Sequence, residues 1–209
     1  SQPVSYKLDS KLGTEAEFKN MIKQCNAVGV DIIADVVLNQ TTGADVADGK
    51  QTGVAGTEYN GSTGDYPGFA TEQYPEGITA SDFHSCSKNI SNYANQQEVQ
   101  ECRLSSMWDF DSESEKVQDI QSDYLAALWN AGVRGFRMDA VKHIHTDSMK
   151  AIKEKFAKKI GVNADSIYWI QEVIGNSSEA AGIQPSNYVQ NGTVTEFGFK
   201  SEMNQTFKD

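Results

Sequence analysis

The chain has 209 residues, of which 38% are hydrophobic and 22% charged, a composition typical of a globular protein. Its formal net charge of −11 argues against nucleic acid or an anionic membrane as a partner, because such surfaces need clustered Lys and Arg. No apolar run approaches the length of a membrane span, and the first residues lack the charged and apolar regions of a signal peptide.

The first predicted unit is a helix followed by a strand. Thr14 and Glu17 have the spacing of a capping box, and apolar residues then recur at three- and four-residue intervals as far as Cys25. This pattern predicts an amphipathic helix that ends near Gly29. Residues 30–39 are nearly all aliphatic, which is typical of a parallel strand buried on both faces.

Residues 40–110 lack this periodicity, and Gly, Thr, Ser, Asn, Asp and Tyr dominate there. An irregular excursion of this length is improbable as a plain loop and indicates an inserted subdomain. Cys86 and Cys102 flank a polar stretch inside it and could be joined by a disulfide, whereas Cys25 is left over.

Two further helix–strand units follow the insert. Ser112 and Glu115 form a second capping box before an apolar helical stripe that leads to a strand at 133–139. Asp147 is expected to cap the next helix, which ends at Gly161 before a strand at 166–174. Repeated helix-then-strand units predict a parallel α/β fold. We expect two α/β segments, at 1–39 and 111–209, separated by the insert at 40–110.

The predicted strands end in polar residues, namely Asp35, Asn39, Arg137, Asp139 and Glu172. Each carboxylate alone is explained equally well as a helix cap or an ion-pair partner. Three strand ends in succession favour a catalytic site, which α/β barrels build at the carboxyl ends of their strands.

Two converging carboxylates are the machinery of glycoside hydrolysis. Arg137 lies on the same strand face as Asp139 and can keep it ionised. Metal-dependent phosphoryl transfer is the competing use, but the sequence has no Walker loop, dinucleotide fingerprint or nucleophile elbow.

Two metal sites need weighing. His143 and His145 have the spacing of a transition-metal pair, but no third nitrogen or sulfur ligand stands out, so we do not expect zinc there. Asn39 and Asp109 are oxygen donors at the two ends of the insert. A hard cation such as calcium, bound between them, would tie the insert to the α/β segments.

Three stretches resemble the short signature regions of the α-amylase family of glycoside hydrolases: "DVVLNQ" at 35–40, "GFRMDAVKH" at 135–143 and "EVI" at 172–174. "ECRLSSMWDF" and "GTVTEFGFK" are similar to animal and actinobacterial members. The resemblance implies a partial TIM (β/α)8 barrel, about strands 3 to 6, with the insert after strand 3. It also implies that the third catalytic carboxylate follows Asp209, so that the 209-residue chain alone has little or no activity.

By position, the resemblance makes Asp139 the nucleophile and Glu172 the general acid/base. The substrate-binding residues that it implies are Asp35, Gln40, Tyr93, Arg137, Lys142, His143 and Ile174. Calcium would be held by Asn39, Asp109 and the main-chain carbonyls of Gln100 and His143, and Arg137 fits a chloride site. The Cys86–Cys102 pairing matches the family, while the usual partner of Cys25 is missing. Gln40 departs from the family, which usually has a sugar-binding His there.

The resemblance therefore predicts a secreted, monomeric enzyme, in its intact form, that cuts α-1,4-glucosidic bonds inside starch- or glycogen-like glucans by a retaining mechanism. Related transglycosylases and debranching enzymes are the first alternative. A non-catalytic sugar-binding homologue is the second, but such proteins usually lose an acidic residue, and both Asp139 and Glu172 are present. A metal-dependent phosphatase is a distant third.

Overall fold

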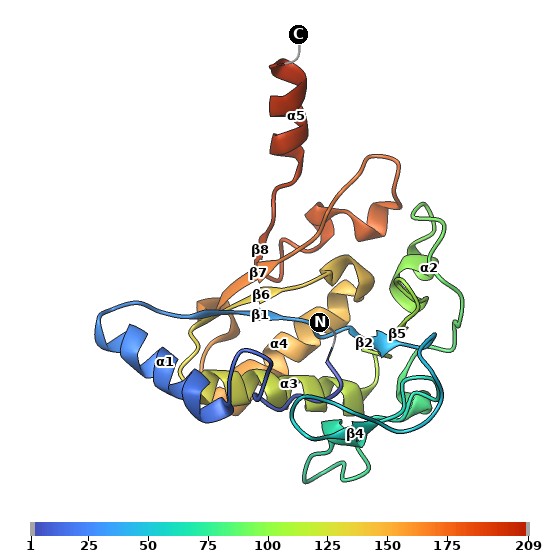
Figure 1. Ribbon diagram of the computed structural model, residues 1–209. Helices are drawn as coiled ribbons and strands as arrows, with labels where there is room; N and C mark the ends of the chain where they lie inside the picture. The colour runs from blue at the N-terminus through green and yellow to red at the C-terminus, as the bar shows by residue number, and fades with distance from the viewer. Residues whose placement is uncertain (1–2, 208–209) are drawn as a thin grey trace.

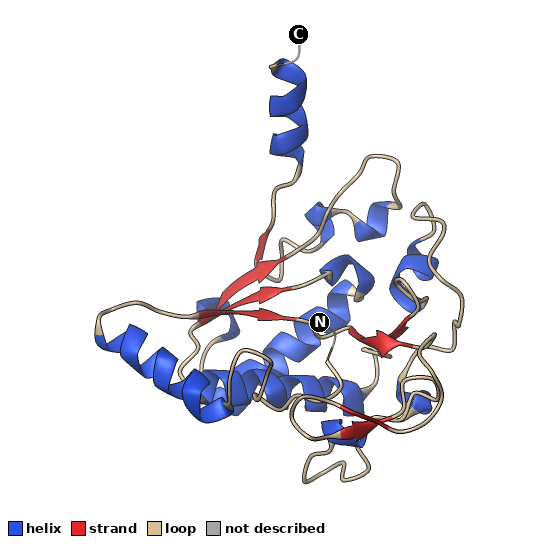
Figure 2. Ribbon diagram, viewed as in Figure 1, coloured by secondary structure: helices blue, strands red, loops and turns tan. Residues whose placement is uncertain are grey.

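The computed structural model describes residues 3–207. Its centre is a parallel sheet whose neighbouring strands follow chain order (Figures 1 and 2): β1 (Ile33–Val36), β6 (Gly135–Met138), β7 (Tyr168–Gln171) and β8 (Thr193–Val194). Because every pair in this sheet is parallel, the carboxyl ends of all these strands lie at one edge.

Helices connect the strands and cover one side of the sheet. In Figure 1, α1 (Glu15–Ala27), α3 (Glu115–Asn130) and α4 (Thr146–Ile160) lie below the strands, and α3 packs against α4. Helix α5 (Gly198–Thr206) points away from the rest of the molecule. The predicted parallel α/β fold is confirmed, since each strand from β6 onward adds to the sheet after a crossover connection.

Local capping explains where α1 begins and where α4 ends, but not where α4 begins. Thr14 and Glu17 make the predicted capping box, and Gly161 ends α4 in the left-handed conformation with φ +72°. Asp147 does not cap α4, because the helix begins one residue earlier, at Thr146. The carboxylate lies instead in the first turn, where a negative charge favours the helix dipole.

The second predicted capping box, at Ser112 and Glu115, is wrong. Helix α3 begins at Glu115 itself, with Ser114 as the preceding cap residue. The Ser112 side chain is buried and donates to the main-chain oxygen of Phe110, so it is directed back toward the insert instead of toward the helix.

The main core lies between the sheet and the helices and contains Leu125, Phe136, Met138, Met149, Phe156 and Trp169. The prediction that residues 30–39 are buried on both faces is wrong for the first half of that stretch. Val30 and Ile33 are 51% and 49% exposed, whereas Val36 and Leu38 are buried. Within the described residues β1 pairs only with β6, so its other side is an edge.

The insert has its own small core. Strands β2 (Gln40–Gly43) and β5 (Met107–Asp109) pair at its base, β3 (Gln51–Thr52) pairs with β4 (Glu58–Tyr59), and α2 (Gln96–Glu101) follows. Its buried cluster contains Tyr66, Phe69, Ile78, Phe83 and Phe110 and continues onto α3 through Val117 and Ile120. The insert is therefore packed firmly against the α/β segments.

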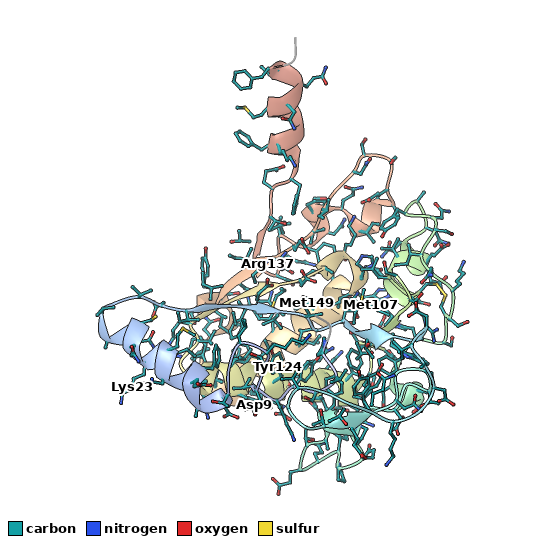
Figure 3. All side chains as sticks on the ribbon, in the orientation of Figure 1. Asp9, Lys23, Met107, Tyr124, Arg137 and Met149 are labelled. Atoms are coloured by element: carbon teal, nitrogen blue, oxygen red, sulfur yellow. A yellow bond between two sulfur atoms is a disulfide. The ribbon has the colours of Figure 1, made fainter. Side chains whose placement is uncertain are left out.

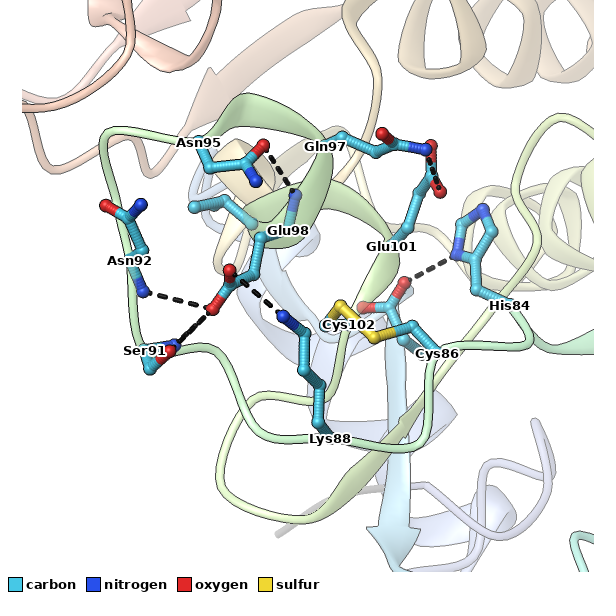
Figure 4. Close-up of a disulfide and its surroundings, with 12 residues drawn as sticks. His84, Cys86, Lys88, Ser91, Asn92, Asn95, Gln97, Glu98, Glu101 and Cys102 are labelled. Carbon is cyan, nitrogen blue, oxygen red and sulfur yellow. Dashed lines mark hydrogen bonds and ion pairs between the residues drawn. A yellow bond between two sulfur atoms is a disulfide. The ribbon is translucent and has the colours of Figure 1, made fainter.

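Short 3-10 turns complete the described chain, at Pro67–Phe69, Ala80–Asp82, Val141–His143, Ala164–Ser166, Ala181–Ile183 and Pro185–Asn187. Cys86 and Cys102 form the expected disulfide (Figure 4), while Cys25 is free. None of the helices within 3–207 is long and apolar enough to cross a membrane.

Candidate active site

Three neighbouring strands bring the predicted catalytic residues to one edge of the sheet. Asp35 of β1 is directly opposite Arg137 of β6 in the strand register. Asp139 and Glu172 come immediately after β6 and β7. Their backbone amides continue the sheet hydrogen bonding, because Asp139 N donates to Val36 O at 2.9 Å and Glu172 N donates to Met138 O at 2.9 Å.

Arg137 is the centre of this group, and its side chain lies at the sheet in Figure 3. Its Nη1 donates to Asp35 Oδ1 at 2.6 Å and to Asp139 Oδ1 at 2.7 Å, and its Nη2 lies 2.9 Å from Glu172 Oε1. The hydrogen bond that Arg137 donates to Asp35, together with the other two carboxylates, raises the pKa of Arg137 above its usual range, although partial burial opposes the shift. A permanently charged guanidinium therefore holds three carboxylates together.

A strained turn fixes Glu172 from the other side. Ala140 has φ +50°, a left-handed conformation that is uncommon for a residue with a Cβ. Its amide N donates to Glu172 Oε2 at 2.9 Å, and the next amide, of Val141, donates to Glu172 O at 2.9 Å. Sequence reasoning missed Ala140, because alanine gives no signal for this conformation.

Lys142 and Tyr93, which the resemblance assigned to substrate binding, lie close together. Lys142 is buried, its Nζ donates to Glu179 Oε2 at 2.8 Å, and it lies 5.2 Å from the ring centre of Tyr93. The amide of Ala180 donates to the main-chain oxygen of Tyr93. Glu179 is a further residue that the sequence did not reveal, since it stands in a polar loop with no motif around it.

His143 is a buried, neutral ring. Its Nδ1 lies 2.9 Å from Val99 O, and because a carbonyl only accepts, Nδ1 must carry the proton. Burial lowers the pKa of His143 to about 4, with the hydrogen bond to Val99 opposing the shift. The Tyr93 ring meets it edge-on at 6.2 Å. The Nε2 of His143 is therefore an acceptor at neutral pH.

Gln40 and Ile174 stand at the margins of this group. Gln40 is 2% exposed, pairs with Asp109 across β2 and β5, and its Nε2 has no hydrogen-bond partner among the described residues. Ile174 is 48% exposed, two residues beyond Glu172. No hydrogen bond or ion pair within 3–207 joins either side chain to Arg137.

The oxygen donors proposed for a cation meet at the junction of the insert and the sheet. Asn39 Nδ2 donates to Asp109 Oδ2 at 2.7 Å and to the main-chain oxygen of His143 at 3.1 Å. Asn39 is 1% exposed, and its Oδ1 is buried without a hydrogen-bond partner. Turning the amide of Asn39 over would direct its Oδ1 at the point that Asp109 Oδ2 and the main-chain oxygen of His143 already face.

These residues fit a calcium ion. Burial raises the pKa of Asp109, with His84 and Asn39 opposing the shift, so a cation at this point would relieve the cost of the buried carboxylate. Gln100 lies in the last turn of α2, where main-chain carbonyls have no partner within the helix. Its side chain is engaged elsewhere, since Nε2 donates to Tyr188 Oη at 3.1 Å. The donor set is all oxygen, as calcium prefers.

Two carboxylates at the ends of adjacent parallel strands are the groups that glycoside hydrolysis needs, and the carboxyl ends of barrel strands are where such sites are built. The family model for the alpha amylase catalytic domain matches residues 5–208. The chain therefore belongs to the alpha-amylase family, whose catalytic domain is a TIM barrel. The parallel sheet described above agrees with that architecture.

Individual relatives agree with the family match. An alpha-amylase of Streptomyces violaceus is 35% identical over 99% of this chain and 32% of its own length. One of Pecten maximus is 35% identical over 100% of this chain and 40% of its own. The chain thus spans 32% and 40% of the lengths of these two relatives.

A solved structure is similar over most of the chain. Alpha-amylase I of Eisenia fetida has a TM-score of 0.82 and 35% identity, covering 94% of this chain and 39% of its own. A mutant of that enzyme has been solved in complex with maltohexaose and gives the same TM-score of 0.82. These values concern only the part of each relative that the chain matches.

Proposed function

We propose that the protein containing this chain hydrolyses α-1,4-glucosidic bonds inside starch- or glycogen-like glucans, with retention of configuration. The observation that carries the proposal is the contact of Arg137 with Asp35, Asp139 and Glu172 at neighbouring strand ends. The maltohexaose complex of the Eisenia fetida enzyme supports an α-glucan as the substrate class.

In the proposed reaction Asp139 attacks the anomeric carbon and forms a covalent glycosyl–enzyme ester. Glu172 donates its proton to the glycosidic oxygen, so the bond to the leaving sugar breaks as the ester bond forms. Glu172 then takes a proton from water, which attacks the same carbon and releases Asp139 as a carboxylate. Arg137 keeps Asp139 ionised and oriented for the first step, through the hydrogen bond of 2.7 Å.

Residues around this pair have proposed substrate contacts. Lys142 and His143 face the leaving-group side of the glucan, with Tyr93 and Ile174 further along the cleft and Asp35 beside Arg137. Gln40 stands where the family usually has a sugar-binding His. Its buried Nε2 has no acceptor within 3–207, so a sugar hydroxyl is a suitable partner.

Calcium, the proposed ion, would be held by Asn39, Asp109 and the main-chain carbonyls of Gln100 and His143, and would stabilise the attachment of the insert. Chloride beside Arg137 is a weaker proposal, because three carboxylates already occupy that guanidinium. We also propose that the parallel strands are about strands 3 to 6 of a (β/α)8 barrel. Secretion is supported by the Cys86–Cys102 disulfide, since such bonds persist in oxidising compartments.

The test is hydrolysis of an α-1,4-glucan by the full-length protein and by its Glu172→Gln variant, with calcium present. Loss of the acid/base should lower the rate by about 10²- to 10⁴-fold. Glu154→Gln on the exposed side of α4 is the matched control and should leave the rate unchanged. A Glu172→Gln variant that cuts as fast as the parent would show that the acid/base is assigned wrongly. Analysis of the products separates hydrolysis from chain transfer.

The expectation that the 209-residue chain alone has little or no activity stays a prediction. It is supported by the apolar side chains Met21, Val30 and Ile33, which are 41%, 51% and 49% exposed beside the free edge of β1. An open sheet edge of this kind favours association over a stable site. Glucan hydrolysis by the homogeneous 209-residue chain, at the rate of the full-length protein, would contradict it.

A further inference from the structure

A cluster of metal-ligating side chains lies apart from the proposed catalytic carboxylates, where the insert returns to the α/β segments. His84, Asp111 and Glu113 each offer a ligand atom, and these atoms all lie within 4.8 Å of one another. We propose that His84, Asp111 and Glu113 are the ligands of a divalent transition metal, with zinc as the bound ion, and that His145 supports the site.

The backbone holds two of these residues in a fixed relation. Phe83 and Phe110 form an antiparallel bridge. On either side of it, His84 N donates to Asp109 O at 3.0 Å and Asp111 N donates to Asp82 O at 3.0 Å. His84 and Asp111 therefore stand on paired segments that are anchored in the aromatic core of the insert.

The distances suit a tetrahedral ion. His84 Nε2 lies 3.2 Å from Glu113 Oε2 and 3.8 Å from Asp111 Oδ1. Zinc bonds to nitrogen and oxygen of roughly 2.0–2.2 Å place neighbouring ligand atoms roughly 3.4 Å apart. Small side-chain rotations therefore suffice to bring the three atoms around one ion.

A hydrogen bond behind the ring prepares His84 as a ligand. Its Nδ1 lies 2.8 Å from Asp109 Oδ1, and Asp109 is 2% exposed. Because a carboxylate only accepts, Nδ1 donates to Asp109 and Nε2 donates to Glu113 in this arrangement, and zinc would replace the proton on Nε2. Zinc-binding histidines are commonly oriented by a carboxylate in this manner. Asp109 would then contact the calcium site through Oδ2 and the zinc ligand through Oδ1.

His145 supplies the second imidazole. It belongs to the pair, His143 and His145, whose spacing is that of a transition-metal site. The two histidines do not act as a pair. His143 is turned to Val99, whereas His145 Nε2 lies 2.9 Å from Glu113 Oε1. His145 therefore either orients Glu113 or becomes a fourth ligand. No sequence pattern indicated this partner, because Glu113 is 32 residues away.

The site is open to solvent on one side. The side chain of His84 is 13% exposed, while those of Asp111 and Glu113 are 40% and 43% exposed. An ion can enter without unfolding the insert, and a water molecule can complete its coordination. Imidazole in the ligand set favours zinc over calcium, which prefers oxygen.

The test is zinc binding to the calcium-saturated full-length protein, measured by equilibrium dialysis and elemental analysis. We expect one zinc ion that excess calcium does not displace. Asp111→Asn and Glu113→Gln should each weaken binding by about tenfold or more. Neither side chain has a hydrogen bond to Asn39 or Asp109 within 3–207, so calcium binding should persist in both variants. Glu154→Gln is the control and should bind zinc normally.

A second measurement does not depend on the folding of any variant. Cobalt bound to the unaltered protein should give the intense visible absorption of a tetrahedral site, and X-ray absorption of the zinc form should show imidazole ligands. Zinc that is not retained, that calcium displaces, that both variants bind as tightly as the parent, or that has only oxygen ligands would each overturn the proposal. In those cases the cluster is a network of ion pairs and holds no metal.

Discussion

At the scale of single residues, Arg137 makes the contacts that hold the proposed site together. Its guanidinium contacts carboxylates from three strands, and the planar fork of five N–H donors makes this geometry available to arginine alone. Lysine keeps the charge but offers one compact ammonium, which cannot reach all three groups at once. The arrangement of the carboxylates thus depends on the shape of the side chain as well as on its charge.

Arg137→Lys should therefore lower glucan hydrolysis by the full-length protein by about 10²-fold, because the reacting carboxylates lose their alignment. The matched control is Arg134→Lys, in which the arginine is exposed and stacks on Trp129 outside the site. Initial rates at saturating and limiting glucan measure the effect. Equal rates for both variants would argue that Arg137 does not orient the catalytic pair.

At the scale of elements, glycines decide how helices turn into strands. Gly132 follows α3 with φ +108°, and Gly161 follows α4 with φ +72°. A Cβ at Gly132 would lie 2.7 Å from Cγ2 of Ile22, whereas a Cβ at Gly161 meets nothing within 4 Å. The two positions separate backbone strain from crowding, because only Gly132 lies where α1 approaches the turn.

Gly161→Ala should lower the free energy of unfolding by about 1 kcal/mol, from the left-handed backbone alone. Gly132→Ala should cost about 2–4 kcal/mol, since crowding against Ile22 is added. Urea unfolding of the two variants beside the parent measures both. Equal losses for the two variants would show that α1 moves away from the turn at no cost, so that crowding against Ile22 contributes nothing.

The disulfide shapes the insert as an element. Cys86 and Cys102 are 16 residues apart, and the loop between them includes Glu98 (Figure 4). The Glu98 carboxylate accepts from the backbone of Ser91 and Asn92, and these bonds lower its pKa to about 2. This contribution to stability is fully present above the ordinary glutamate pKa and is lost as pH falls toward 2.

Replacing both Cys86 and Cys102 by Ser should lower the free energy of unfolding by about 3 kcal/mol, the value expected for closing a loop of this length. Cys25→Ser is the control, because Cys25 is free. Denaturant unfolding with and without reductant measures the effect. If reductant destabilises the Cys86→Ser, Cys102→Ser variant as much as the parent, the bond is not the cause.

At the scale of the whole molecule, the insert and the sheet meet at one buried polar point. Asn39 is 70 residues from Asp109 and 104 from His143, yet it bonds to both. The same junction carries the proposed calcium ligands, and one of them, Asp109, contacts His84 of the cluster proposed for zinc. An ion at this point would link the insert to the strands that carry Asp139 and Glu172.

Removal of calcium by a chelator should therefore destabilise the full-length protein. At a calcium concentration of about 10³ times the dissociation constant, the loss is about 4 kcal/mol. Asp109→Asn should make stability insensitive to the chelator, whereas Asp165→Asn on the surface should respond like the parent. Thermal unfolding in both conditions measures this. A parent protein with the same midpoint in either condition would contradict the calcium assignment.

Several features could be predicted from the sequence because their causes are local. The capping box at Thr14, the glycine that ends α4 and the recurring helix–strand units all depend on residues that are near one another in the chain. The same holds for the placement of Asp139 and Glu172, which directly follow recognisable apolar strands. Local reasoning failed at Ser112 and Asp147, because packing against the insert and the actual start of α4 decided the caps.

By itself, then, the sequence determined the parallel α/β fold, the insert and the residues that stand at the strand ends, since periodicity and motifs act over short distances. Only the tertiary structure decided which of these residues meet. Asp35 and Arg137 are 102 residues apart, and the separation of His143 from His145 depends on Val99 in the insert and on Glu113 just after it. Contacts between distant segments are set by how the strands and the insert pack, and no local pattern encodes that packing.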